Sequence, residues 1–212
     1  MNDINKVLVL SPHTDDGELG AGGTIAKFLE QGIDIYYIAF SGCEASVPQG
    51  LPKNTLRKEC KRSTKILGLK PDKVIIMDYE VRTLPEHRQE ILEKLIKLKG
   101  EFQPEIVLVP SSHDMHQDHG VIYWEALRAF KKEASIWGYE HPWNNLSFST
   151  DIFVVLNLKN MERKLKALKE YKTQKSKSYM DEKNIMALGS TRGSQLDQPY
   201  AETFELIRLI VN

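Results

Sequence analysis

The chain has 212 residues, of which 41% are hydrophobic, a composition that is typical of a folded globular protein and excludes an intrinsically disordered one. Lysine plus arginine and aspartate plus glutamate each number 29, so no net charge draws the protein toward nucleic acid or an anionic membrane. The two cysteines, Cys43 and Cys60, are too few for a disulfide scaffold, and we expect both to be small apolar side chains.

The first residues, Met1–Lys6, are polar, and the apolar run that follows them extends only from Val7 to Leu10. Such a run is too short for the core of a signal peptide or for a membrane span, so we expect a cytoplasmic protein. No internal repeat or low-complexity linker divides the chain. Its length therefore predicts one domain, residues 1–212.

The first three-fifths of the chain alternates between segments typical of strands and segments typical of helices. Short apolar or β-branched runs predict strands at 7–10, 33–40, 73–77 and 105–109. Helical spacing predicts helices at 24–31, from a cap at Asn54 to about Leu67, at 86–99, and around 121–127. This order predicts an α/β fold with a doubly wound, mostly parallel sheet and helices on both faces.

The remainder of the chain is less regular. It contains a predicted strand at 152–158 and a predicted helix at 161–171. Several lysines, among them Lys164, Lys166 and Lys169, give this helix a basic bias. A solvated helix face is a better explanation of these lysines than a phosphate site.

A first polar cluster, Ser11–Glu18, follows the first predicted strand, at the kind of sheet edge where parallel folds bind ligands. His13 and Asp16 are three residues apart and fall on one side of a turn, and both are suitable zinc donors. Asp15 points elsewhere and can act as general base on a metal-bound water. The alternative is that the two aspartates cap a helix that begins near Glu18, and this cluster alone leaves both open.

A second polar cluster, His113–His119, follows the predicted strand that ends at Val109. If the two strands are neighbours, the two clusters face each other. His116 and His119 have the same spacing of three, so one can complete a zinc site while the other donates a proton or stabilises an oxyanion. Because a carboxylate bonded to a histidine fixes its tautomer, Asp118 fits such a site. Together the clusters favour a metal site over helix capping.

The segment Pro12–Gly23 resembles the opening motif of the LmbE-like de-N-acetylases, also named for the enzyme that deacetylates N-acetylglucosaminyl-phosphatidylinositol (PIG-L). His116–His119 is similar to the second motif of that family: a histidine, any residue, an aspartate and a histidine. Thr14 and Gly17 depart from the pattern, which more often has proline and an acidic residue there. Weaker similarities run almost to the end of the chain, at Arg57, Glu59, Leu67–Gly68, Pro142–Trp143, Asp151–Ile152, Gln174, Arg192–Gly193, Tyr200–Glu202 and Phe204.

The resemblance implies a Rossmann-like fold and one zinc ion per chain, held by His13, Asp16 and His119. It implies that Asp15 is the general base for attack of a zinc-bound water. Protonated His116, oriented by Asp118, would stabilise the oxyanion or protonate the leaving amine. The implied reaction removes the N-acetyl group of an N-acetylglucosamine-like sugar or glycoconjugate. Relatives are often oligomeric, which leaves a homo-oligomer open, and no nucleic-acid partner is expected.

Substrate contacts are less specific in the sequence. Arg57 and Arg192 are candidates to bind a sugar hydroxyl or an anionic group, and the alternative for each is an ion-paired structural arginine. Trp143 and Tyr79 are candidates to stack on a sugar face, although packing is the commoner use of both. His113 and Asp114 are candidates to support the ligands by hydrogen bonds, and the alternative is that they only shape the loop. His87 and His141 are expected to be ordinary residues.

Three other functions remain as alternatives. A phosphoesterase or a glycosyltransferase could use paired aspartates, but the share of histidine favours zinc and a carbonyl target. A non-catalytic metal- or sugar-binding protein would have no need of Asp15 beside Asp16. A nucleotide binder is suggested by Gly20, Gly22 and Gly23, but their spacing is not the dinucleotide fingerprint.

Overall fold

The computed structural model describes residues 4–211, so residues 1–3 and 212 of the predicted domain lie outside the described residues. Within residues 4–211, seven strands form one sheet in the order β3-β2-β1-β4-β5-β7-β6. Neighbouring strands from β3 to β5 are parallel, whereas β7 is antiparallel to both β5 and β6. The strands are β1 (Lys6–Ser11), β2 (Asp34–Ala39), β3 (Val74–Ile76), β4 (Ile106–Pro110), β5 (Ser135–Tyr139), β6 (Ile152–Leu156) and β7 (Tyr200–Arg208).

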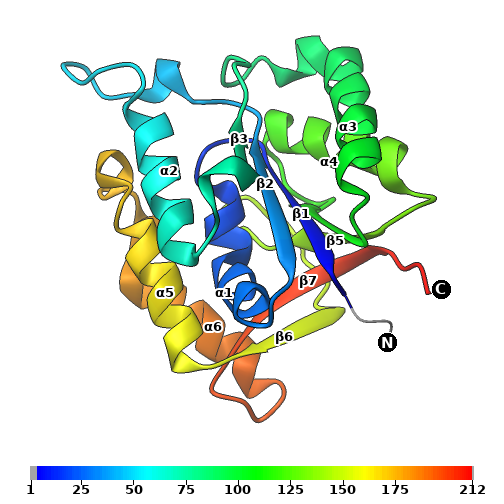
Figure 1. Cartoon of the computed structure of the whole chain (residues 1–212). Helices are drawn as coiled ribbons and strands as arrows, with labels where there is room; N and C mark the ends of the chain where they lie inside the picture. The colour runs from blue at the N-terminus through cyan, green and yellow to red at the C-terminus, as the bar shows by residue number, and fades with distance from the viewer. Residues whose placement is uncertain (1–3, 212) are drawn as a thin grey trace.

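Helices cover both faces of this sheet (Figure 1). One face carries α1 (Asp16–Glu30), α2 (Thr55–Leu67) and α5 (Leu158–Leu168), with α6 (Glu182–Ser194) beside α5; the other carries α3 (Arg88–Phe102) and α4 (Gln117–Phe130). Successive side chains of a strand point to opposite faces, so Val7 and Val9 enter one core and Leu8 and Leu10 enter the other. Burial on both sides is the reason that this strand is an uninterrupted apolar run. The predicted doubly wound, mostly parallel α/β fold is confirmed.

Helix α1 begins much earlier than predicted, at Asp16 rather than near Thr24, and it contains the glycines that were expected to precede it. It is kinked at Ala21, where φ is −140° and ψ is 16°. A Cβ atom at Gly20 would lie 2.4 Å from the ring of Tyr139, and one at Gly23 would lie 2.4 Å from Leu156 Cδ1. The glycines therefore allow α1 to approach β5 and β6 closely, and this packing outweighs their low helix propensity.

Three elements were not predicted: β5, α6 and β7. Strand β7 lies between β5 and β6, so its pairing depends on two strands that precede it by more than forty residues. Strand β5 contains Gly138, where a Cβ atom would lie 3.0 Å from Ser111 Cα. Most other elements differ from the prediction by about three residues or fewer at their ends.

The strand order places the two polar clusters together. Strand β1 pairs with β4 on one side and with β2 on the other, so the chain winds outward in both directions from this point. A crevice forms at such a switch point, outside the carboxyl ends of the strands. The clusters that follow Ser11 and Pro110 meet there. No helix in the described part of the chain combines the length and hydrophobicity needed to cross a bilayer.

Candidate active site

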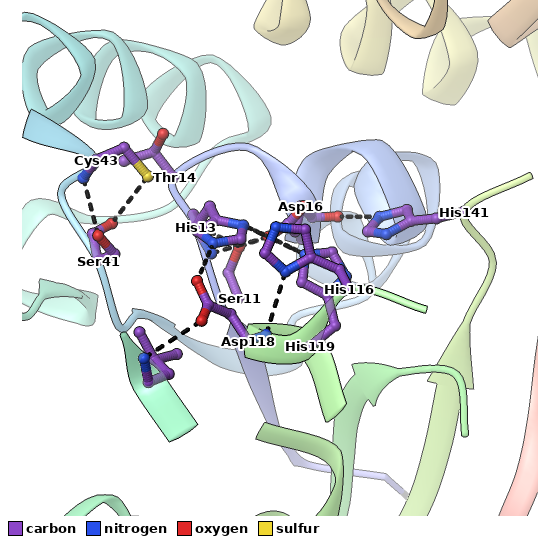
Figure 2. Close-up of polar contacts among 12 residues, drawn as sticks. Ser11, His13, Thr14, Asp16, Ser41, Cys43, His116, Asp118, His119 and His141 are labelled. Carbon is purple, nitrogen blue, oxygen red and sulfur yellow. Dashed lines mark hydrogen bonds and ion pairs between the residues drawn. The ribbon is translucent and has the colours of Figure 1, made fainter. Parts of the chain in front are cut away.

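Three side chains from the two clusters meet at this crevice, as Figure 2 shows. Asp16 Oδ2 lies 3.0 Å from His13 Nδ1 and 3.2 Å from His119 Nε2. The two imidazole nitrogens are 3.3 Å apart. The carboxylate of Asp16 and the ring of His119 are almost completely buried. The structure thus brings together His13, Asp16 and His119, the three residues expected to hold a metal.

This donor set fits a zinc ion. Donors about 2.0–2.2 Å from a tetrahedral zinc lie roughly 3.3–3.6 Å from one another, close to the separations of 3.0–3.3 Å found here. Two further groupings of possible ligand atoms overlap this one, the first with His116 and the second with His141. His13, Asp16 and His119 have short separations throughout and include an anionic donor, so we prefer them as the ligand set.

Each ligand histidine is backed by a carboxylate. His13 Nε2 lies 2.8 Å from Asp118 Oδ2, and His119 Nδ1 lies 2.7 Å from Asp114 Oδ2. An ionised carboxylate only accepts hydrogen bonds, so these nitrogens carry the protons. In the neutral rings, the lone pairs of His13 Nδ1 and His119 Nε2 are therefore directed at the site, as in many metal centres.

Without a cation, these histidines hold protons strongly. Burial lowers the pKa of His13, but the carboxylates of Asp16 and Asp118 outweigh burial and raise it to about 10. In His119, burial is likewise outweighed by Asp16 and Asp114, and the pKa rises to about 9. Asp16 is buried too, yet the two histidines hold its pKa well below the usual range. A surplus of negative charge thus surrounds the imidazoles, which is a suitable environment for a divalent cation.

Asp15 stands next to the ligand Asp16 and lines the same cavity of about 250 Å³. It occupies the N-cap position of α1, but its side chain makes no capping hydrogen bond, so the capping alternative does not explain it. Burial, followed by the charge of Asp16, raises the pKa of Asp15 to about 6. A carboxylate with this pKa is mostly ionised at neutral pH and can still accept a proton.

His116 lies beside the ligand histidines, with its ring centroid 4.8 Å from that of His13 and 4.7 Å from that of His119. Burial and the charges of His119 and His13 lower its pKa to about 4, so the protonated form expected from the sequence is not favoured. His116 Nδ1 accepts the backbone N–H of Asp118 at 3.2 Å. The neutral ring must then carry its proton on Nε2, where it is a hydrogen-bond donor rather than a cation.

The expected role of Asp118 changes accordingly. Its carboxylate accepts hydrogen bonds from His13 Nε2 and from the backbone N–H of Arg82 at 2.6 Å, and so it does not orient His116 with its side chain. The hydrogen bond from Asp118 to that ring comes from its backbone N–H. The reason is the start of α4 at Gln117, which turns the buried Asp118 side chain toward β1 and leaves His116 at the N-cap.

A buried network holds the loop that carries His13 and Asp15. The hydroxyls of Tyr37 and Tyr171 both donate to the carboxyl group of Glu18, and both also contact the backbone oxygen of Thr14. Burial raises the pKa of Glu18 to about 7. Tyr37 stands where a side chain at position 17 would be, because a Cβ atom on Gly17 would lie 2.7 Å from its ring. This explains why Gly17 departs from the family motif to which Pro12–Gly23 is similar.

His141 was expected to be an ordinary residue, but the structure places it at the site. It is fully buried, its Nε2 lies 3.1 Å from the backbone oxygen of Asp16, and its Nδ1 lies 3.4 Å from Asp114 Oδ2. It follows β5, the next parallel strand after β4, so strand prediction was the signal that would have revealed it. Since β5 was not predicted, that signal was missed.

The candidate substrate residues fall in different places. The guanidinium group of Arg57 bonds to Glu44, Asp78 and the backbone oxygens of Ile76 and Met77, and it does not line the metal-site cavity. These contacts favour the structural alternative for Arg57. Arg192 pairs with Glu140 and lines a second cavity.

The two aromatic candidates for stacking on a sugar also lie in different places. Trp143 lines the cavity of the metal site, whereas Tyr79 is buried in the core under α3. Cys43 also lines the metal-site cavity, and burial raises the pKa of its thiol to about 12, which keeps the thiol protonated in the metal-free protein.

Comparison with known proteins agrees with this geometry. Residues 8–130 match the family described as GlcNAc-PI de-N-acetylase. Diacetylchitobiose deacetylase from Thermococcus kodakarensis is 34% identical over 127 residues, which cover 56% of this chain and 46% of that protein. The chain thus spans about half the length of this relative. The uncharacterized deacetylase YaiS of Escherichia coli is 28% identical over 175 residues, 81% of this chain and 93% of that one.

The fold is shared with solved structures. The N,N'-diacetylchitobiose deacetylase from Pyrococcus horikoshii superimposes with a TM-score of 0.78 and 23% identity, covering 97% of this chain and 84% of that one. The family match contains both polar clusters and more than half of the chain, as the resemblance of the two motifs predicted. The chain belongs to the GlcNAc-PI de-N-acetylase (PIG-L, LmbE-like) family.

Proposed function

We propose that this protein is a zinc-dependent deacetylase that removes the N-acetyl group from an N-acetylglucosamine-like sugar or glycoconjugate. The observation that carries the proposal is the set of three donor atoms, 3.0–3.3 Å apart, with Asp15 beside them in one cavity. The names of the relatives support an acetylated amino sugar as the class of substrate.

His13, Asp16 and His119 would hold the ion. When bound, Zn²⁺ supplies a Lewis acid that polarises a carbonyl group and acidifies a water molecule. Asp118 and Asp114 keep the two ligand rings in the tautomers that this role requires. Release of the protons now held on the metal-facing side of the rings accompanies loading, so zinc affinity rises with pH.

The chain's own residues account for the proton transfers. Asp15 takes a proton from the attacking water, whose oxygen forms a bond to the acetamide carbon. The Nε2–H of neutral His116 donates a hydrogen bond to the carbonyl oxygen as negative charge develops there. When the C–N bond breaks, Asp15 returns its proton to the leaving nitrogen. Acetate and a free amino sugar are the products, and Asp15 regains its charge.

The test combines metal analysis with product analysis. We expect about one zinc per chain by elemental analysis and acetate release from N-acetylglucosamine derivatives. Removal of the metal with a chelator should abolish acetate release, and added Zn²⁺ should restore it. A protein that holds zinc and binds the sugar without releasing acetate would instead be a non-catalytic member of the family. Release of phosphate or of a nucleotide would indicate a phosphoesterase or a glycosyltransferase.

A further inference from the structure

A second cavity, of about 420 Å³, adjoins the cavity of the metal site. It lies between α6, the short turn Ser178–Met180 and β7, and we refer to it as the neighbouring cavity. Its volume is in the range of small-ligand pockets. Leu19, Trp143 and Tyr179 line both cavities, so the two share one wall.

The walls of the neighbouring cavity are largely apolar. Ile185, Leu188 and Gly189 are three and four residues apart and therefore lie on one side of α6, and Met161 lines the same cavity from α5. A Cβ atom at Gly189 would lie 2.7 Å from Met161 Cε, so glycine lets α6 pack closely against α5. An apolar lining of this kind favours an apolar ligand group.

The charged side chains that line the neighbouring cavity neutralise one another. Arg192 pairs with Glu140 through two of its nitrogens, with Nε 3.0 Å from Oε2. Lys164 Nζ lies 2.7 Å from Glu202 Oε1, and Glu202 also accepts the backbone N–H groups of Gly23 and Thr24. Each cation already has an anionic partner. A phosphate or carboxylate group of a ligand would have to break one of these pairs, so the cavity suits an uncharged group.

Besides Leu19, the wall between the two cavities contains two stacked rings. The Trp143 and Tyr179 centroids are 4.6 Å apart with an interplanar angle of 21°, and Trp143 also stacks on His141 at 4.8 Å. In the described part of the chain, neither the indole N–H of Trp143 nor the hydroxyl of Tyr179 forms a hydrogen bond. The rings can therefore adjust to a ligand that lies across them without the loss of a polar contact.

We propose that the neighbouring cavity binds an uncharged alkyl group of the substrate, which extends across the Trp143–Tyr179 wall from the amino sugar at the metal site. The inference rests on the proposed deacetylation and specifies a further part of its substrate. The alkyl group has two possible sources: the aglycone of the sugar, or an N-acyl chain longer than acetyl. Both present the same chemistry to Leu188 and Ile185.

The activity experiment distinguishes the two sources. The first arm compares the hexyl and methyl glycosides of N-acetylglucosamine, and the second compares N-hexanoyl- with N-acetylglucosamine. Because each buried methylene improves binding about four-fold, we expect kcat/KM to rise about ten-fold or more with the longer chain in one arm. Leu188→Trp should reduce that ratio to about one by filling the cavity. The matched control Leu196→Trp, at an exposed residue that lines neither cavity, should keep the wild-type ratio.

A binding experiment separates this inference from the proposed function. Hexyl β-glucoside has no acetamide group, so its binding to the metal-free protein, measured by calorimetry, does not require deacetylation. We expect saturable binding that Leu188→Trp weakens about ten-fold or more and Leu196→Trp leaves unchanged. Binding of hexyl glucoside without acetate release from any substrate would support alkyl binding in the neighbouring cavity and contradict the proposed deacetylation. If acetate is released but the kcat/KM ratios are near one in both arms and hexyl glucoside does not bind, the proposed role of the neighbouring cavity is wrong and the proposed deacetylation stands.

Discussion

The parallel and the antiparallel parts of the sheet contribute differently to this protein. The candidate ligands, the carboxylates that support them, Asp15 and His141 follow the parallel strands β1, β4 and β5, whose carboxyl ends meet at one edge. The antiparallel strands β6 and β7 and helices α5 and α6 supply no ligand. They supply Tyr171 and Lys164 behind the site and the walls of the neighbouring cavity.

The charges of the two parts are balanced in different ways. Around the ligand histidines, Asp16, Asp114 and Asp118 form a surplus of carboxylates that a divalent cation would neutralise. In the antiparallel part, Lys164 and Glu202 neutralise each other within the protein. The parallel part is thus arranged for a cation, whereas in the antiparallel part this pair leaves no charge for a ligand to neutralise.

The largest expected effect lies in the parallel part. Asp15→Asn keeps the size of the side chain but removes its ability to accept a proton, so we expect turnover to fall about 10³-fold or more. Zinc content by elemental analysis should remain near the wild-type value, because Asp15 is not among the preferred ligands. Wild-type acetate release by this variant would show that another group is the base.

The corresponding substitution in the antiparallel part is Lys164→Met. It leaves the buried Glu202 carboxylate with two backbone donors and no cation, which destabilises a protein by about 3–5 kcal/mol. Urea denaturation measures the change. As control, Lys97→Met removes the exposed pair with Glu101 and should change stability by less than about 0.5 kcal/mol. Equal effects of the two substitutions would show that the buried pair stabilises the fold no more than the exposed one.

Glu18 links the parallel and the antiparallel parts of the protein, because it contacts Tyr37 of β2 and Tyr171, which follows α5. Its pKa is raised by burial from 4.5 to about 7, so the folded protein keeps a proton that the unfolded chain releases between these values. The protonated carboxyl group contributes fully to stability below pH 4.5. This contribution, about 3 kcal/mol of the free energy of unfolding, is lost as the pH rises through 7.

Glu18→Gln cannot ionise and should remove this part of the pH dependence. Unfolding of the metal-free protein, followed between pH 4.5 and 7, is the measurement. We expect the wild type to lose more stability than the variant over that interval. Parallel curves for the two proteins would show that Glu18 ionises normally in the fold.

The smallest expected effect concerns the carboxylates behind the ligands. Asp118→Asn weakens the hydrogen bond to His13, so zinc affinity should fall about 10–100-fold while the ligand set remains intact. Competition with a chromophoric chelator measures the affinity. If His116 rather than His13 were the partner of this side chain, the variant would lose turnover and keep its affinity for zinc.

Much of the parallel part was readable from the sequence. Val7–Leu10 and Ile106–Val109 are apolar runs because both faces of their strands are buried, and polar clusters at their ends mark the ligand edge. The spacing of three in His13–Asp16 is local, so a turn alone brings both side chains to one side. By contrast, β5 and β7 depend on pairing with distant strands, and α1 begins early only because its glycines meet Tyr139 and Leu156.

The sequence by itself predicted the layered α/β fold, which the structure confirms, and it identified the candidate ligands and candidate base in two polar clusters, because these depend on local spacing, on motif resemblance and on burial patterns along single segments. The tertiary structure alone decided which carboxylate supports which histidine. The partners His13 and Asp118 are 105 residues apart, so their contact follows from the pairing of β1 with β4 and the start of α4. The same holds for His141 and for the neighbouring cavity, whose walls come from segments that only folding brings together.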